Sequence, residues 1–582
     1  MSTLPALEQN LIDWLSGALT SIAPEYVSRL TLERTRQANH GDYASPIALQ
    51  LAKSLRLPPR EVAQRILALL PPSVLIDHVE LAGAGFINIF LSSAARQSVV
   101  MEILNGGSLY AQSDQENDRR VLVEFVSSNP TGPLHVGHGR GAAYGASLCN
   151  ILEKAGYQVH REYYVNDAGR QMDILTVSTW LRALNNTGKL SFPFPANGYQ
   201  GDYVLSMAQD ALDRFSLGDT ENMVSALLHA CPGLNNQDTG DEEAQMDCLI
   251  ASAKTLLGDI YQNLHAFVLA QQLSDCRDDL QEFGVVFDEW FSEQSLFDSG
   301  SVAKIVERLS EAGHLYRDQG ALWFRSTAFG DEKDRVVQRD NGLYTYFASD
   351  IAYHVNKFER GFDRLINVWG ADHHGYIPRV EAALIALGYD VAHLSVPLVQ
   401  FVSLFRQGEK AQMSTRKGQF VTLRHLREEV GRDAARLFYV LRKSDQHLDF
   451  DLDLARAQSQ DNPVYYIQYA HARISRVLER WGGNTDLLHS VDLSALIQPE
   501  EVELFQILRA YPVLIQQAAQ ELAPHLLAFY LRDLAASFHG YYNAVPFLDC
   551  PEALARLALL KSIQIVLRDG LTLLGVSAPD VM

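Results

Sequence analysis

The sequence predicts a multidomain protein in which a Rossmann-type α/β domain with a parallel sheet stands between an N-terminal α+β domain and a C-terminal all-α helical bundle. Its length exceeds one compact core and suggests about three or four domains. Strand-like and helical segments alternate in the middle of the chain, whereas the last part is almost entirely helical. We therefore predict domains at residues 1–115, 116–455 and 456–582.

The N-terminal region combines helical and strand-like spacing. Apolar residues recur at helical intervals in ALEQNLIDWLSGAL and in SPIALQLAKSLRLPPREVAQRILALL. VELAGAGFINIFL has the composition of a strand punctuated by glycine. The polar stretch AQSDQENDRR then indicates a linker to the next domain.

The central region opens with a βαβ pattern. Residues 120–126, RVLVEFV, are typical of a buried parallel strand, a helix is expected from about His138 to Ala155, and QVHREYYV follows as a second strand. An acidic, mostly helical stretch at about residues 185–295 interrupts this rhythm, and we interpret it as an insertion. The α/β pattern resumes with ALWFRST, RLINVWG and HLSVPLVQFV.

Composition restricts the classes of protein to which the chain can belong. No run approaches the length of an apolar membrane span, and the N-terminus carries acids instead of a basic leader, so we expect neither a span nor a signal peptide. Five cysteines without a C-x-x-C pair argue against a zinc knuckle or a disulfide framework and favour a reducing cytosol. The net charge of -21 disfavours a general nucleic-acid binder, so an RNA partner must meet local basic patches.

Two histidines, His135 and His138, stand in HVGH where a helix is expected to begin. Free backbone N–H groups and the positive end of the helix dipole suit phosphate, and Gly137 lets a nucleotide approach the backbone closely. Both imidazoles can face one ligand and, as donors or cations, stabilise negative charge that develops on phosphate. For the tetrapeptide alone, however, a helix cap or a surface position explains the histidines better.

A second polar segment, QMSTRKGQFVTL at residues 412–423, places Arg416 and Lys417 ahead of another strand-like run. A mobile loop of this kind can bring cations onto a triphosphate during a reaction. Taken alone, the segment is better explained as a solvated surface turn.

HVGH after a strand and a basic MSTRKG loop far downstream together resemble the two signatures of class I aminoacyl-tRNA synthetases. The resemblance is to bacterial-type arginyl-tRNA synthetase, and it extends nearly end to end through EFVSSNPTGPLHVGHGRGAAYG, YYVNDAGRQMD, NGYQGDY, YFASDIAYH, VWGADHHGYIPR, LDFDLDLA and NPVYYIQYAHARI. It implies an arginine–tRNA ligase that forms arginyl-adenylate from L-arginine and ATP and transfers the arginyl group to the 3′ end of tRNA(Arg). It also implies Mg²⁺ with the ATP, no zinc or organic cofactor, no membrane or DNA partner, and a cytoplasmic monomer.

The same resemblance assigns the amino-acid pocket. It implies that Glu124, Ser128 and Asn129 line this pocket and that Tyr346 and Asp350 contact the guanidinium. The chemistry agrees, because a guanidinium offers five donors and needs carboxylates and neutral acceptors. Without the resemblance, Tyr346 and Asp350 are an ordinary surface pair, and Glu124 is a strand-end carboxylate held by a local arginine.

GADHHG at residues 370–375 follows a strand, where nucleotide sites of open α/β sheets gather. We interpret Asp372, His373 and His374 as contacts near adenosine and the amino acid and not as a metal triad, because adjacent ligands on a short loop rarely converge on one ion. The resemblance thus gives His135, Gly137, His138, Gly370, Asp372, His373, Met413, Ser414 and Thr415 as ATP contacts, His135, His138, Arg416 and Lys417 as catalytic residues, and His374 as a further arginine contact.

The basic loop departs from the usual KMSKS signature. Gln412 and Thr415 stand at its two lysine positions, and the charge has moved to Arg416 and Lys417, with Lys410 just upstream. Which of these cations meets the phosphates therefore stays open.

The segment NPVYYIQYAHARISRVLERW has an apolar helical stripe and a second face that is aromatic and basic. Aromatic rings stack on unpaired bases and arginine neutralises phosphate, although a solvated arginine stripe is the alternative. Resemblance to the anticodon-binding domain favours RNA contact, and resemblance of the N-terminal domain implies contact with a tRNA D-loop base. The implied tRNA contacts are Tyr465, Tyr469, Arg473 and Arg476, together with Phe86 and Asn88.

Two other functions compete with the ligase. Another class I synthetase or a small nucleotidyltransferase shares the HxGH loop, but a nucleotidyltransferase does not need the helical C-terminal domain. A non-catalytic tRNA-binding paralogue would be supported by the loss of either histidine, and both are present.

Overall fold

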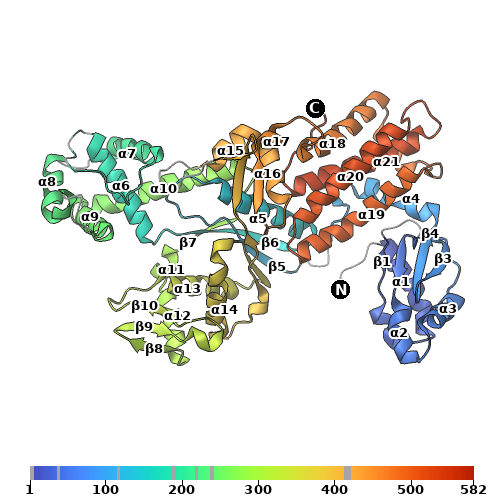
Figure 1. Ribbon diagram of the computed structural model, residues 1–582, viewed down its shortest axis with the longest axis horizontal. Helices are drawn as coiled ribbons and strands as arrows, with labels where there is room; N and C mark the ends of the chain where they lie inside the picture. The colour runs from blue at the N-terminus through green and yellow to red at the C-terminus, as the bar shows by residue number, and fades with distance from the viewer. Residues whose placement is uncertain are drawn as a thin grey trace. The chain divides into compact units, whose positions relative to one another are not determined.

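The computed structural model of the protein describes residues 6–35, 40–113, 118–186, 188, 190, 192–215, 220–235, 241–411 and 421–582. The chain divides into two compact units; Figure 1 shows their helices and strands coloured by position in the sequence. The first consists of Met1–Asp118, Asn150–Tyr157 and Ala457–Met582, and the second of Arg119–Cys149 and Gln158–Arg456. None of the helices formed by the described residues has the length and apolar character needed to cross a bilayer.

In the first unit, the N-terminal residues form an antiparallel sheet covered by helices. The strands lie in the order β1 (Glu33–Arg34), β2 (Tyr43–Ser45), β4 (Phe86–Leu91) and β3 (Ile76–Ala82). Apolar side chains of this sheet share one core with α1 (Ala6–Thr20), α2 (Ile47–Leu55) and α3 (Pro59–Leu69). The continuous helical spacing of residues 45–70 is divided into two helices because Arg56 adopts a left-handed conformation and Pro59 begins a new first turn.

The C-terminal part of this unit confirms the predicted helical bundle. Its long helices are α18 (Pro463–Trp481), α19 (Pro499–Gln520), α20 (His525–Ala544) and α21 (Ala553–Leu573), and α4 (Ser93–Gly106) packs against two of them, α19 and α21. Ile467, Ala470 and Ile474 of the predicted apolar stripe on α18 are fully buried.

The second unit contains the predicted parallel sheet. Its strands lie in the order β13 (Leu394–Ser395), β11 (Arg364–Asn367), β5 (Arg120–Glu124), β6 (Gln158–Val165) and β7 (Glu289–Ser292), and every pair is parallel. The chain leaves β5 through α5 (Val136–Lys154) toward β6, and later returns to the opposite side of β5 as β11. Strand order therefore reverses between β5 and β11, and ligands of open α/β sheets bind at the carboxyl ends of such a pair.

The remaining elements of this unit surround that sheet. ALWFRST forms β9 of a small antiparallel sheet and does not join the parallel sheet. The elements are β8 (Leu315–Asp318), β9 (Ala321–Phe324), β10 (Arg335–Gln338), β12 (Trp369–Gly370), β14 (Leu398–Val399), β15 (Val402–Arg406), β16 (Glu409–Lys410), β17 (Leu448–Asp451), α11 (Gln294–Asp298), α12 (Ser301–Glu311), α13 (Tyr346–Glu359), α14 (Ile377–Ala386), α15 (Leu423–Val430), α16 (Arg432–Val440) and α17 (Leu452–Arg456).

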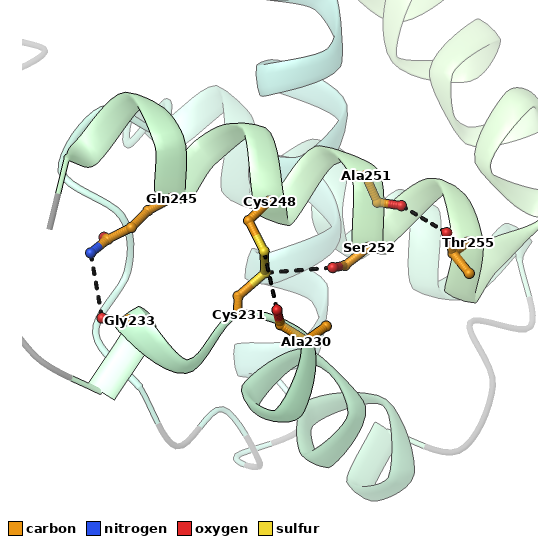
Figure 2. The surroundings of a disulfide bond; sticks show 8 residues. All are labelled: Ala230, Cys231, Gly233, Gln245, Cys248, Ala251, Ser252 and Thr255. Carbon is orange, nitrogen blue, oxygen red and sulfur yellow. Dashed lines mark hydrogen bonds between the residues drawn. A yellow bond between two sulfur atoms is a disulfide. The ribbon is translucent and has the colours of Figure 1, made fainter.

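A helical segment with its own core separates β6 from β7. It consists of α6 (Arg170–Asn186), α7 (Asp202–Arg214), α8 (Thr220–Ala230), α9 (Glu242–Leu257) and α10 (Asp259–Glu282). Against the prediction from cysteine spacing, a disulfide joins Cys231, just after α8, to Cys248 on α9 (Figure 2). The prediction was wrong here because the pair is 17 positions apart and becomes adjacent only when α8 and α9 pack together, so no local spacing marks it.

Candidate active site

A cavity of about 350 Å³ opens at the carboxyl ends of β5 and β11. Glu124, the last residue of β5, pairs in register with Asn367, the last residue of β11. The cavity is lined by Glu124, Val126, Ser127, Tyr164, Asn166, Tyr346, Asp350, Tyr353, His354, Val368, Trp369, Gly370, His373 and Tyr376.

The turn after β5 is shaped by an unusual backbone. Val126 and Ser127 have φ values of 69° and 40°, in the left-handed region that residues other than glycine rarely adopt. Phe125, just before them, is fully buried against Gly145 of α5, where a Cβ would lie 2.3 Å from the Phe125 ring. The tight packing holds the turn that separates Glu124 from HVGH.

Two acidic side chains have no resident cation: Asp350, which lines the cavity, and Glu293, which lies behind its lining. Asp350, in the first turns of α13, accepts a hydrogen bond from the Tyr376 hydroxyl, and burial raises the pKa of Asp350 to about 7. Glu293, after β7, accepts a hydrogen bond from Ser349 Oγ at 2.7 Å, and burial raises its pKa as well. No ion pair joins either carboxyl to a lysine or arginine within the described ranges, and the charge of Glu293 raises the pKa of Asp350 further.

Sequence reasoning missed Glu293, although a signal was available. It follows EWFS, which forms β7, so it stands at the carboxyl end of a third parallel strand. Our interpretation of residues up to about 295 as insertion concealed this strand.

Glu124 has a basic partner, as the alternative interpretation expected, but the partner is a lysine. Lys357 Nζ donates a hydrogen bond to Glu124 Oε2 at 2.5 Å, and Lys357 is completely buried. Glu124 nevertheless lines the cavity.

The HVGH histidines lie side by side at the start of α5, with ring centroids 3.6 Å apart. His135 Nδ1 accepts hydrogen bonds from the backbone N–H groups of Gly137 and His138, and His138 Nδ1 accepts one from the N–H of His135. Burial lowers the pKa of His138 to about 3 and also lowers that of His135, so both rings are neutral at pH 7. Since Nδ1 is an acceptor in both, the proton of each ring resides on Nε2, and each ring is a neutral donor instead of a cation.

Gly137 lies close to the ring of His135. A Cβ there would lie 2.9 Å from Cε1 of His135, so the glycine makes room for the histidine ring.

The segment that leaves the basic loop pairs with HVGH. Val136 donates its N–H to Val421 O at 3.2 Å, and Leu423 donates to Leu134 O at 2.7 Å. The predicted residues Gln412, Met413, Ser414, Thr415, Arg416 and Lys417 lie outside the described residues, but both signatures are joined through backbone at the point where the loop ends.

Arg140, a buried arginine of α5, holds two other segments of the chain against this helix. Arg140 is 1% exposed and donates hydrogen bonds to three main-chain carbonyls, those of Gln400, Lys443 and Gln446, at 2.8–3.0 Å. It thereby connects the helix of HVGH to the segments that lead into β15 and β17.

The other predicted contacts are distributed around the cavity. Gly370 and His373 line it, whereas Asp372 and His374 are exposed beside it in a short helix at residues 371–376. Asn129 accepts a hydrogen bond from Asn166, which lines the cavity, at 3.1 Å. Ser128 does not line the cavity: this residue is buried, and its hydroxyl lies 2.7 Å from the Tyr163 hydroxyl.

Among the described residues, one group of potential metal ligands comes together, and it does not include Asp372, His373 or His374. His160, Glu162 and Glu289 come together, but the Arg360 guanidinium already pairs with both carboxylates, at 2.6 and 2.8 Å. A protein cation therefore occupies the position that an ion would need.

The aromatic and basic face of α18 forms as predicted. Tyr465 and Tyr469 stack with centroids 5.7 Å apart, and Arg473 lies over the rings of Tyr469 and Tyr542 at 4.5 and 4.7 Å. Arg476 is exposed. In the N-terminal sheet Phe86 is half-buried, whereas Asn88 is only 3% exposed.

Three family models match the chain: the arginyl tRNA synthetase N terminal domain at residues 9–91, the catalytic domain of class I (R) tRNA synthetases at 99–195 and 245–458, and the DALR anticodon binding domain at 467–582. The chain is 58% identical to an arginine–tRNA ligase of Azoarcus sp. (strain BH72) over 581 residues, 98% of this chain and 99% of that one. It is 52% identical to an arginine–tRNA ligase of Legionella pneumophila (strain Paris) over 563 residues, 95% of each chain. The solved arginyl-tRNA synthetase of Thermus thermophilus superposes with a TM-score of 0.72 at 25% identity, covering 99% of this chain and all of that one.

Proposed function

Because the chain belongs to the arginyl-tRNA synthetases, class I enzymes that use ATP to attach arginine to tRNA, we propose that the cavity at β5 and β11 binds arginine with its guanidinium between Asp350 and Glu293. The observation that carries this proposal is the pair of carboxyl groups without a resident cation, that of half-buried Asp350 and that of buried Glu293. A guanidinium supplies the missing charge and can donate to both. Tyr346, which is 51% exposed at the start of α13, covers the side chain.

Arginine then points its α-carboxylate toward HVGH, and Glu124 and Asn129 hold its α-ammonium group. The carboxylate attacks the α-phosphate of ATP, and the Nε2–H groups of His135 and His138 stabilise charge on the phosphate. Gly137, Gly370, Asp372 and His373 border the nucleotide, and His374 is a further contact of the arginine. Met413, Ser414, Thr415, Arg416 and Lys417 supply contacts from the loop. The terminal tRNA hydroxyl finally takes the arginyl group, and catalysis rests on positioning and charge stabilisation without a covalent nucleophile.

Several further properties belong to this proposal. Mg²⁺ arrives with the triphosphate, and the enzyme has no zinc and acts as a cytoplasmic monomer without a DNA or membrane partner.

The domain limits at 115 and 455 and the insertion at about 185–295 stay predictions. The family matches support them, because the matching family changes at residues 91–99 and 458–467.

ATP–pyrophosphate exchange tests the function directly. Each amino acid is supplied in turn, with and without total tRNA, and we expect exchange with arginine alone among them. Exchange only in the presence of tRNA would mean that RNA completes the site. A folded protein that binds tRNA but exchanges with no amino acid would contradict catalysis by this cavity.

Arginine affinity is expected to depend on pH through Asp350. Its pKa of about 7 in the free enzyme means that below neutrality a proton must leave before the guanidinium can pair with the carboxylate. The dissociation constant for arginine therefore rises by about tenfold per pH unit below 7 and is constant above it. Fluorescence of Trp369, which lines the cavity, can report binding; a constant affinity on both sides of neutrality would argue against this role of Asp350.

For tRNA, we propose contacts from Tyr465, Tyr469, Arg473 and Arg476 and from Phe86; the burial of Asn88 makes its side chain a weaker candidate. Arg473→Ala removes a cation and weakens the stack with Tyr469. We expect the KM for tRNA to rise, the KM for arginine to stay unchanged, and the slope of affinity against salt to fall by about 1. The exposed Lys304 on α12 provides a control as Lys304→Ala, and equal salt slopes for both variants would contradict the contact.

A further inference from the structure

Beneath the arginine cavity lies a hydrogen-bonded network whose centre is Lys357. Lys357 Nζ donates to Glu124 Oε2 at 2.5 Å and to Asn367 Oδ1 at 2.8 Å, and it lies 4.1 Å from the centroid of the Tyr353 ring. Lys357 and Asn367 are both 0% exposed. Lys357 therefore cannot act as a solvated surface charge.

The network continues to the helix that carries Asp350. Asn367 Nδ2 lies 2.8 Å from His354 Nε2, and His354 Nδ1 lies 2.8 Å from the main-chain oxygen of Asp350. Burial lowers the pKa of His354 to about 3, so the ring is neutral. Nδ1 then carries its proton and donates to Asp350 O, while Nε2 accepts from Asn367, and all four bonds from Glu124 to Asp350 are satisfied.

Nearby acids do not compete for Lys357. Glu162 accepts a hydrogen bond from the Tyr353 hydroxyl at 2.6 Å and pairs with Arg360 at 2.6 Å. Asp350 and Glu293 form no ion pair with Lys357 among the contacts of the described chain. Of the carboxyl groups of Glu124, Asp350 and Glu293, that of Glu124 alone is therefore matched with a protein cation.

We infer that Lys357 is a positioning residue that sets the direction in which arginine enters the cavity. This inference rests on the proposed binding of arginine between Asp350 and Glu293. Because Lys357 satisfies the charge of Glu124, the guanidinium gains most at Asp350 and Glu293, and the α-carboxylate is left facing the ATP. Without Lys357, Glu124 becomes a third free carboxylate, and the guanidinium can bind at the wrong end.

Misdirected binding has a kinetic signature that a packing defect does not share. In Lys357→Met, arginine still binds, but a fraction is reversed and unreactive, so kcat and KM for arginine fall together by about tenfold. A purely structural role predicts a raised KM instead. Lys304→Met on α12 is the matched control, because that lysine is exposed.

Agmatine, which is arginine without its carboxylate, tests the charge argument directly. As an inhibitor, it is expected to bind Lys357→Met about tenfold more tightly than the parent enzyme, because a free Glu124 attracts it. In Lys357→Met/Glu124→Gln this gain disappears. Glu124→Gln alone leaves Lys357 without its acid, and agmatine then binds more weakly than to the double variant.

The outcomes separate this inference from the proposed function. Asp350→Asn serves as the reference: if it leaves arginine and agmatine affinity unchanged, the proposed cavity itself is wrong. If Asp350→Asn weakens both ligands while Lys357→Met leaves agmatine affinity unchanged or reduced, the role assigned to Lys357 is wrong. Should Lys357→Met fail to fold in a thermal melt, Glu124→Gln and the double variant decide instead, and equal agmatine affinities in these two overturn the inference.

Discussion

His138→Ala lowers kcat for arginine-dependent ATP–pyrophosphate exchange by about 10²- to 10³-fold, the usual cost of removing one preorganised donor from a developing charge. The ring is neutral and its Nε2–H is the group that is lost, since Nδ1 is engaged with the N–H of His135. The KM for arginine stays within about twofold, because the substituted ring lies on the phosphate side of the reaction. Pre-steady-state measurement of adenylate formation checks the result.

His138 is the better first choice of the two histidines. His135 Nδ1 also accepts hydrogen bonds from two backbone N–H groups at the start of α5, so its replacement disturbs the helix as well as the chemistry. His138→Asn keeps a donor and is expected to retain part of the activity. A rate in His138→Ala equal to that of the parent enzyme would exclude the ring from catalysis.

Asp350→Asn has the second large effect, and it acts in opposite directions on activity and on stability. Loss of one partner of a desolvated charge pair costs about 3–5 kcal/mol, so kcat/KM for arginine falls by roughly 10²- to 10⁴-fold. The same substitution stabilises the protein without arginine at pH 8. A carboxyl whose pKa is raised by folding destabilises the folded state progressively as pH rises from its unfolded pKa to about 7, and asparagine removes that effect.

Thermal melts without and with arginine measure both parts of this prediction. Asp350→Asn is expected to raise the melting temperature of the free enzyme at pH 8 and to abolish most of the increase that arginine produces. Glu359→Gln, near the end of the same helix and half exposed, controls for a general effect of losing an acid from α13. A lower melting temperature for Asp350→Asn at pH 8 would contradict the burial argument.

Local sequence patterns predicted those parts of the site that lie on one continuous stretch of chain. The βαβ pattern around HVGH and the start of α5 within about two residues are confirmed. Lys357 could not be found in this way, because it lies two turns beyond Asp350 on α13 and meets Glu124 only through the fold. Glu293 was missed because the strand that precedes it was interpreted as part of the insertion. The pairing of Cys231 with Cys248 likewise depends on helix packing.

Local sequence patterns also could not predict that the rings of His135 and His138 are neutral. The sequence allowed donors or cations, and only the hydrogen bonds to Nδ1 and the burial of both rings distinguish the two. Similarly, the sequence of β4 does not reveal that Asn88 is covered by its neighbours in the sheet while Phe86 is partly open.

The hydrogen bonds from Arg140 to three main-chain carbonyl groups determine which nearby positions of this enzyme tolerate mutation. Every amino acid carries a main-chain carbonyl, so the residues at positions 400, 443 and 446 can change identity without weakening the contact, whereas no other side chain reproduces the planar fork at position 140. In a saturation mutagenesis screen scored by growth, we expect one intolerant position next to three permissive ones. Sequence drift can then change the side chains at these three positions while the connection of their segments to the HVGH helix is inherited unchanged.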